Sequence, residues 1–415
     1  MLRVLSNALL QDGRHVDVVV AGGVIVEVIP AGTFAATPAL QGQVGPEIDD
    51  LGGRLLLPAL AEPHAHLDKA LLAQSVPNPT GDLMGAIDAM VAASAAGRFT
   101  YDDTVERAAA ALQRLLVSGV TAVRTHVDVG DGVGVSNLLA VREARMRFEG
   151  LMDVQIAALM HSPMTGPEGA VNRSALADAL EVGVEVIGGC PHLENDGPAS
   201  IALAIEAATE AGIGIDMHTD ETLDPSVRTL GELARQVHES GFGHPVSASH
   251  CVSLAMQAPD VQAEVIAQVA AAGISVIPNP QTNLFLQGRG HRVATPRGIA
   301  PITALRDAGV LVAAGADNVQ DPFNPVGRSD PFETAALLVM AAHQLPQAAF
   351  DLVSNNARQV IGLTRVSMSP GDRADFVAIA APSVRAAIAD ASRDRRVYRA
   401  GRLVATSTET SVVHR

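Results

Sequence analysis

Short runs of apolar, β-branched residues recur along the middle of the chain, and each is followed by an alanine-rich stretch with helical periodicity. Eight such runs lie between residues 55 and 317. Most are apolar at nearly every position, as parallel strands buried on both faces are. The helices expected between them include residues 104–118, 200–211, 263–272 and 302–308. Strict alternation of strand and helix, repeated eight times, predicts an α/β fold, a closed (β/α)8 TIM barrel.

The two ends of the chain have a different pattern. Residues 16–30 contain two β-branched runs separated by Ala-Gly-Gly, which predicts a hairpin. Residues 374–380 and 395–407 are again short strand-like runs, the second broken by a turn at Gly401. We therefore expect the ends, residues 1–57 with 366–415, to meet as one small sheet domain beside a barrel of residues 58–365.

Composition narrows the class of protein. Apolar residues make up 48% of the chain and aromatic residues 3%, so alanine, valine, leucine and isoleucine must fill a large core. The formal charge of −16 disfavours nucleic acid and anionic membranes as partners. Two cysteines are too few for a disulfide framework. Without a signal-peptide pattern or a long apolar span, we expect a soluble cytoplasmic protein, which could form a homo-oligomer.

Polar residues suited to chemistry stand at the ends of the strand-like runs. In a (β/α)8 barrel these carboxyl ends face one mouth, where active sites lie. A histidine or a carboxylate at seven of the eight ends predicts a shared site there. In chain order, the residues at the ends are His64 and His66, His126 and Asp128, His161, His192, His218, His250, Asn279 and Asp317.

The His64-x-His66 pair is the sharpest of these elements. Residues i and i+2 of a strand point to the same side, so both imidazoles can reach one ion. His218 and Asp317 would add a third nitrogen and an oxygen, a set that suits one Zn²⁺ or Fe²⁺. The two cysteines are poorer candidates, because free thiols are common core residues.

Glu221 lies three residues beyond His218, in the expected loop over the mouth. A carboxylate there can take a proton from an activated water and deliver it to a leaving nitrogen, although acids also favour the first turn of a helix. His250 could bind a second metal or hydrogen-bond the water. We favour the second role, because the fourth run has no lysine that carbon dioxide could modify into a bridging ligand.

These motifs resemble the amidohydrolase superfamily, specifically its cytosine deaminase-like branch, and its small β-sandwich domain resembles the β-rich ends. Other features resemble relatives that hydrolyse N-alkylamino-triazines such as N-isopropylammelide, namely Asp317-Asn318 and the stretches RTHVDV and HLDK. The stretches that carry the main resemblance are LPALAEPHAHLDKALL, MHTDETLD, SASHCVSL, IPNPQTNLFLQGRG and GADNVQDPFNPVGRSD.

The resemblance implies one metal ion on the four residues above, Glu221 as proton shuttle and His250 as partner of the nucleophilic hydroxide. It also implies substrate contacts from Asn283 and from three positions that depart from the branch. His161 stands where cytosine deaminases have a glutamine, Asn318 where they have a second aspartate, and Phe323 where they have a tryptophan. These departures keep the hydrolytic core and change the residues that read the substrate.

The sequence thus predicts hydrolytic removal of ammonia from an aminated pyrimidine, pterin, purine or triazine. An alternative is an amidohydrolase that acts on an N-alkylamino-triazine or a cyclic amide with the same metal site. A third hypothesis is a metal-binding barrel without activity, and the intact ligand set together with Glu221 argues against it.

Overall fold

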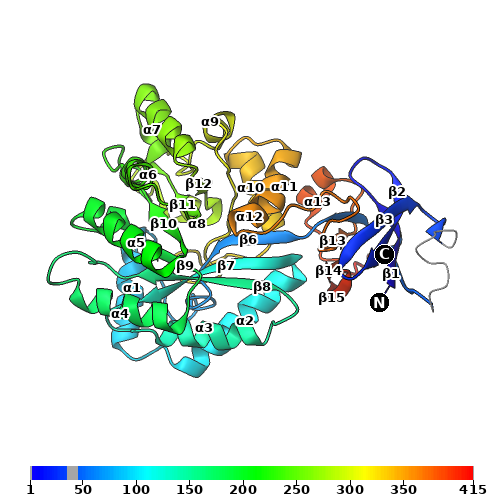
Figure 1. Cartoon of the computed structure of the whole chain (residues 1–415), viewed down its shortest axis with the longest axis horizontal. Helices are drawn as coiled ribbons and strands as arrows, with labels where there is room; N and C mark the ends of the chain where they lie inside the picture. The colour runs from blue at the N-terminus through cyan, green and yellow to red at the C-terminus, as the bar shows by residue number, and fades with distance from the viewer. Residues whose placement is uncertain (1, 35–44, 415) are drawn as a thin grey trace.

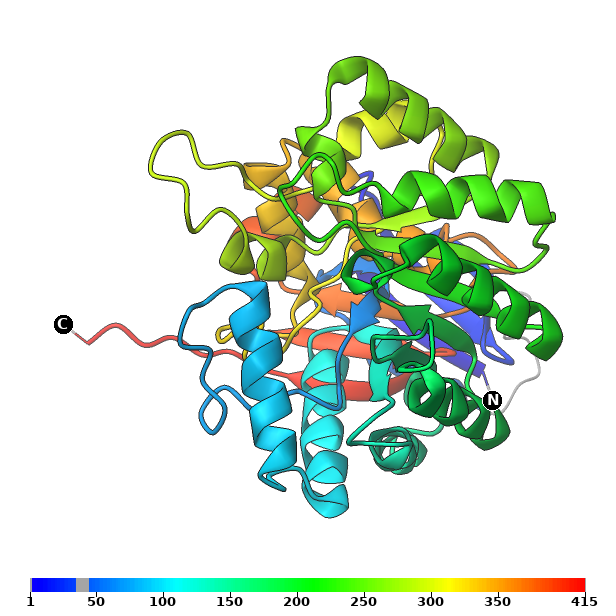
Figure 2. The same cartoon turned by 90° about the vertical axis from the view of Figure 1, so that its left-hand side faces the viewer.

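The computed structural model describes residues 2–34 and 45–414, arranged as a barrel and a separate sheet (Figure 1). The barrel lies at one end of the long axis of the molecule, and the sheet, built from both ends of the chain, lies at the other. In the view turned by 90°, helices surround the barrel strands (Figure 2). No helix among the described residues is long and apolar enough to cross a membrane.

Seven parallel strands form the barrel wall, with neighbours in the order β12-β11-β10-β9-β8-β7-β6. Their buried positions are mainly alanine, valine, isoleucine and methionine, as expected for strands that are covered on both faces. The strands are β6 (Leu60–Ala65), β7 (Val120–Val129), β8 (Asp153–Met160), β9 (Val186–Gly189), β10 (Gly214–Thr219), β11 (Val246–His250) and β12 (Ser275–Ile277).

The eighth predicted run closes the barrel without becoming a regular strand. Residues 309–317 make two isolated parallel bridges, Val276 to Val312 on one side and Ala65 to Asp317 on the other. Single backbone hydrogen bonds support both contacts: the amide of Gly315 donates to the carbonyl of Pro278, and the amide of Asp317 donates to the carbonyl of His64. The amide of Ala316 donates to the Glu62 carboxylate at 3.0 Å. We call residues 309–317 the seam of the barrel.

Helices follow the strands as the sequence predicts, and four match the expected ranges to within a few residues: α2, α5, α7 and α9. Gly212 ends α5 in the left-handed conformation, with φ of 68°, which is the expected glycine cap. The helices are α1 (Leu83–Ala95), α2 (Tyr101–Val117), α3 (Ser136–Met146), α4 (Ala170–Val182), α5 (Gly197–Ala211), α6 (Thr229–Ser240), α7 (Pro259–Ala271), α8 (Pro280–Leu286), α9 (Ile302–Asp307), α10 (Pro331–Ala341), α11 (Pro346–Val353), α12 (Asn355–Val360) and α13 (Val384–Asp390).

The ends of the chain meet in one sheet, which confirms the prediction from their β-rich pattern. The strand order is β15-β14-β13-β5-β1-β2-β3, with β4 paired to β1. The predicted hairpin over residues 16–30 is β2 with β3, and residues 35–44 lie outside the described residues. The strands are β1 (Leu2–Leu9), β2 (His15–Ala21), β3 (Val24–Pro30), β4 (Glu47–Asp50), β5 (Leu55–Pro58), β13 (Phe376–Ile379), β14 (Arg395–Arg399) and β15 (Arg402–Ser407).

The first predicted run, residues 55–63, is divided between the two bodies. Its first half is β5, which pairs with β13 of the small sheet, and its second half enters the barrel as β6. The change occurs at Ala59, whose amide donates to the carbonyl of Asp375, while the amide of Leu60 donates to the carbonyl of Gly119. The sheet is therefore joined directly to the strand that carries His64.

Candidate active site

Four side chains from distant segments converge at the barrel mouth. His64 and His66 come from the end of β6, His218 from β10 and Asp317 from the seam. His66 Nε2 lies 3.2 Å from His218 Nε2 and 3.2 Å from Asp317 Oδ1, and His64 Nε2 lies 3.6 Å from the same oxygen. All four residues are nearly fully buried. The structure thus places His64, His66 and His218 within 4.8 Å of one another, and Asp317 within the same distance of His64 and His250.

The three separations given above are compatible with one divalent cation. Ligands at ~2.1 Å from a tetrahedral ion stand ~3.4 Å apart, close to the separations above. His64 Nε2 and both Asp317 oxygens are buried and have no hydrogen-bond partner among the described residues. Such groups are costly to bury unless something binds them. The cluster could therefore hold a metal ion.

The protonation states also favour a cation. Burial, and then the neighbouring imidazoles, lower the pKa of His64 and His218 well below 6.5, so both rings are neutral. Burial raises the pKa of the Asp317 carboxyl, but the imidazoles of His66 and His250 outweigh it and keep the pKa below its usual value. Neutral imidazole and ionised carboxylate are the forms that bind metal.

A buried polar network lies beneath the cluster, and the sequence analysis missed it. Ser249 Oγ contacts His64 Nδ1 at 2.9 Å and donates to Asp216 Oδ1 at 3.0 Å. Asp216 also accepts from Arg124 at 2.7 Å, and His126 Nε2 lies 3.5 Å from it. Since Arg124 already neutralises this carboxylate, Asp216 supports the cluster from behind. Side chains alternate between the two faces of a strand, so the sequence could have placed Arg124, Asp216 and Ser249 inside the barrel. It could not have shown which of them contact one another.

Glu221 lies in the loop after β10, beside the cluster. Its Oε1 is 3.2 Å from His250 Nδ1 and accepts a hydrogen bond of 3.1 Å from the side-chain amide of Asn283. Burial, and then the charge of Asp317, raise the pKa of Glu221 well above 4.5. Because α6 begins only at Thr229, Glu221 does not start a helix, and its position is one from which it can exchange a proton.

His250 joins this group to the seam. Its Nε2 lies 3.9 Å from Asp317 Oδ2, and burial lowers its pKa to about 4, so the ring is neutral. The backbone of His250 has φ of +66° and that of Asp317 has φ of +67°. Left-handed conformations are strained for such residues and cluster at functional sites. Both side chains are thus turned toward the mouth at the ends of their segments.

A group of charged side chains lies beside Nδ1 of His66, whereas Nε2 of the same ring faces Asp317 and His218. Lys69, the only lysine of the sequence, is buried, with its Nζ 2.6 Å from Asp128 Oδ1 and 3.4 Å from His66 Nδ1. His161 Nε2 lies 3.8 Å from Asp128 Oδ2, and His161 Nδ1 is 3.1 Å from the carbonyl of Asp131. We call Lys69, Asp128 and His161 the charged triad.

The other predicted substrate contacts lie on α8 and after the seam. The side chain of Asn318 bonds within the protein, accepting from Thr282 at 3.1 Å and donating to Asp321 at 2.8 Å. Phe323 is partly exposed, and its amide donates to the same aspartate. Asn283, at the buried side of α8, contacts Glu221 and His250 instead.

The two cysteines contribute nothing that a metal would need. Burial raises the pKa of both thiols, which keeps them protonated. Cys251 lies 3.2 Å from the hydroxyl of Thr219, behind the mouth. The thiolate is the form that binds metal, so the histidines and the aspartate remain the better donors.

Comparison with known proteins agrees with this geometry. The chain is 32% identical to a pterin deaminase from Rhizobium rhizogenes, over 94% of this chain and 87% of that protein. It is 22% identical to an N-isopropylammelide isopropyl amidohydrolase from a Pseudomonas species, over 97% and 96% of the two chains. The structure superposes on 5-methylcytosine deaminase from Klebsiella pneumoniae with a TM-score of 0.87 and 26% identity, covering 100% and 99%.

The match to a family agrees as well, and it extends beyond the barrel. Residues 78–405 match the amidohydrolase family, which takes in most of the barrel and the C-terminal strands of the small sheet. Together with the 32% identity over nearly the whole chain, this match confirms the resemblance predicted from the sequence motifs. The chain belongs to the amidohydrolase family.

Proposed function

We propose that this protein is a metal-dependent hydrolase that removes an amino group from a nitrogen heterocycle as ammonia. The observation that carries the proposal is the pairing of Glu221 with His250 at 3.2 Å, beside the cluster that could hold a metal. The similarity to a pterin deaminase and to a 5-methylcytosine deaminase supports the same class of reaction.

In this proposal His64, His66, His218 and Asp317 hold one ion, Zn²⁺ or Fe²⁺. Such an ion lowers the pKa of water bound to it toward ~7, which supplies a nucleophile at neutral pH. The residues of the chain then have separate tasks. The Ser249–Asp216 pair fixes the ring of His64, and Asn283 fixes the carboxyl group of Glu221.

Glu221 moves the protons. It accepts one proton from the attacking water as the C–O bond forms and delivers it to the adjacent ring nitrogen. It then accepts the remaining hydroxyl proton and delivers it to the amino nitrogen as the C–N bond breaks. Ammonia leaves and the ring carbon retains a carbonyl oxygen. His250, neutral and held by Asn283 and Glu221, donates or accepts a hydrogen bond at the oxygen that attacks.

In this proposal the charged triad recognises the ring of the substrate. Lys69 can donate to a ring carbonyl, and Asp128 can accept from the adjacent ring N–H, so the two together read an amide edge. Pterins, oxidised pyrimidines and hydroxylated triazines carry such an edge. Asn283, Asn318 and Phe323 are proposed as further contacts, as is His161 through its imidazole.

An ammonia-release screen of the metal-loaded protein against pterins, aminopyrimidines, purines and amino-triazines tests the proposal. We expect ammonia from at least one pterin or pyrimidine with an intact amide edge. The relative that hydrolyses N-isopropylammelide favours a second candidate, removal of an alkylamine from a triazine. Release of isopropylamine instead of ammonia identifies that reaction. Protein with bound metal that releases neither amine contradicts the proposal.

A further inference from the structure

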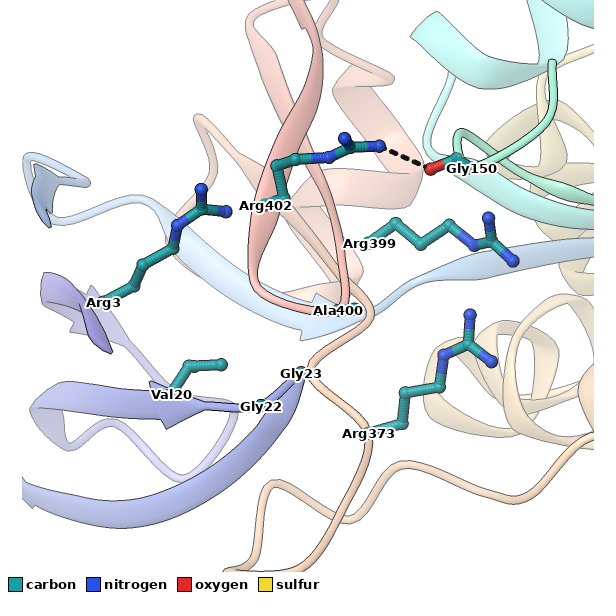
Figure 3. Close-up of a pocket in the computed structure, with 9 residues that line it drawn as sticks. All are labelled: Arg3, Val20, Gly22, Gly23, Gly150, Arg373, Arg399, Ala400 and Arg402. Atoms are coloured by element: carbon teal, nitrogen blue, oxygen red, sulfur yellow. Dashed lines mark hydrogen bonds between the residues drawn. The ribbon is translucent and has the colours of Figure 1, made fainter. Parts of the chain in front are cut away.

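A pocket of about 450 Å³ lies where the small sheet meets the loop that precedes β8 of the barrel (Figure 3). It contains none of the candidate active-site residues. Four arginines and several residues without large side chains line it, and the arginines extend around a common space in the close-up. The arginines are Arg3 from β1, Arg373 from the segment before β13, Arg399 from β14 and Arg402 from β15.

The carboxylates nearby do not neutralise all of this charge. Arg3 pairs with Glu47 at 2.9 Å, Arg373 and Arg399 share the carboxylate of Asp153, and Arg373 also pairs with Asp375 at 2.8 Å. Arg402 donates to the carbonyl of Gly150 at 2.7 Å, and within the described part of the chain it has no carboxylate at ion-pair distance. Its charge therefore remains available to a ligand, in a chain whose formal charge is −16.

Arg399 adds an unsatisfied donor. Its side chain is 14% exposed, and its Nε is buried without a hydrogen-bond partner among the described residues. A buried donor that lacks a partner is costly, and a guanidinium pairs best with a carboxylate or phosphate through two parallel hydrogen bonds. Asp153 occupies one end of the Arg399 guanidinium, and Nε is the donor that remains without a partner among the described residues.

The backbone keeps the pocket open. Gly22 and Gly23, in the turn between β2 and β3, have φ of +61° and +85°, a conformation that side chains rarely adopt. At Gly22 nothing lies within 4 Å of an added Cβ, so the turn forms an uncovered side of the pocket. Gly150 presents its backbone from the barrel. The volume lies within the ~300–1,000 Å³ of typical small-molecule sites.

We propose that this pocket binds a small phosphate-bearing anion and so links the small sheet to the barrel. The planar forks of several arginines suit the oxygens of a phosphate or diphosphate group. Because the ligand contacts both bodies only in the folded protein, it stabilises the fold by RT ln(1 + L/Kd), which rises with the ligand concentration L. The site is independent of the proposed deaminase activity.

The test is calorimetric titration of the full-length, metal-loaded protein with inorganic phosphate, pyrophosphate and citrate, together with thermal unfolding. We expect saturable binding, with pyrophosphate tightest, and a rise in Tm with its concentration. Two variants test the location. Arg402→Ala removes the arginine that lacks an acidic partner, and Ala400→Asp leaves every arginine but adds a carboxylate at an exposed lining residue whose φ of +50° aspartate tolerates.

Each variant is expected to weaken pyrophosphate binding by about tenfold or more, the loss typical of one charge-assisted hydrogen bond. Arg14→Ala is the matched control, because Arg14 is exposed, pairs only with Asp12 among the ion pairs of the described residues and does not line the pocket. Equal binding by wild type and both variants overturns the proposal, since the anion then binds elsewhere, for example at the metal centre. Citrate binding tighter than pyrophosphate overturns the assignment to phosphate.

Discussion

The hydroxyl of Ser249 lies 2.9 Å from His64 Nδ1 and gives its only proton to Asp216. The bond to the imidazole must therefore be donated by Nδ1–H of His64. This arrangement fixes the tautomer of the ring and leaves the lone pair of Nε2 facing Asp317, 3.6 Å away. Ser249 is not itself a proposed metal ligand, but it thus determines the tautomer and orientation of the His64 ring.

Ser249→Ala is expected to weaken binding of zinc by about 10–100-fold, as loss of a partner behind a histidine ligand typically does. The fold should be retained, because the substitution removes one oxygen. Competition with a chromogenic chelator measures the affinity. Ser253→Ala is the control, since that hydroxyl donates to the carbonyl of Val227 and lies outside the network. Equal zinc affinity in both variants contradicts the role given to Ser249.

Glu221→Gln is expected to retain metal and to lower kcat by about 10²–10⁴-fold, because the amide keeps the shape but cannot accept the proton. Metal content by mass spectrometry and kcat on the best substrate of the screen are the measurements. Glu239→Gln, in which an exposed carboxylate of α6 is changed, serves as control. A kcat close to that of wild type in Glu221→Gln assigns the proton transfer to another group.

Lys69→Arg is expected to raise KM by about tenfold or more while metal content is unchanged. Arginine keeps the charge but is larger, and its planar fork does not reproduce the single contact of 2.6 Å to Asp128. Steady-state kinetics on the best substrate of the screen and metal content by mass spectrometry are the measurements. An unchanged KM in Lys69→Arg places the ring elsewhere.

The charged triad also predicts a pH dependence of stability. Burial lowers the pKa of His161, but the hydrogen bond and charge of Asp128 outweigh it and raise the pKa above the ordinary 6.5. The stabilisation by this pair is therefore complete below pH 6.5 and is lost as pH rises through the raised pKa. Urea unfolding at several pH values should show the largest deficit of His161→Gln below pH 6.5. A deficit that grows with pH contradicts the sign.

Arg358→Met tests the connection between the two bodies. Arg358, on α12, is fully buried and lies 3.2 Å from Asp375, which precedes β13. Removing one partner of a buried ion pair costs about 3–5 kcal/mol, because the other charge is left in the interior. Arg373 still pairs with Asp375, which places the expected loss at the lower end of that range. Arg14→Ala, at an exposed pair, should change the free energy of unfolding by less than about 1 kcal/mol.

Alternation of apolar strands and alanine-rich helices was sufficient to predict the barrel, because this periodicity is a local property of the chain. The division of residues 55–63 was not predictable in the same way, since it depends on Asp375 and Gly119 as backbone partners. The seam also escaped prediction, because Glu62 competes for the amide of Ala316 across 254 residues. The proposed division into residues 1–57 with 366–415 and 58–365 stays a prediction.

The candidate site was predictable as far as strand ends determine it. His64, His66, His218 and Asp317 stand at carboxyl ends that any such barrel brings to one mouth. The residues that support these ligands were not predictable, because the sequence around a serine or an arginine in an apolar strand does not show which residues it contacts. Ser249 and Asp216, 33 residues apart, meet only once β10 and β11 pair in register. The roles assigned to the site residues remain predictions that the substitutions above test.

The seam differs from the seven strands of the barrel wall in how it is held in place. Strands β6 to β12 pair along ladders, whereas residues 309–317 make two isolated bridges supported by single backbone hydrogen bonds to their neighbours. Substitutions at Asn318 and Phe323, which follow Asp317, can therefore change the mouth without breaking a ladder of the wall. Enzymes with this barrel can therefore acquire new substrates through changes in this one segment, while the seven strands stay the same.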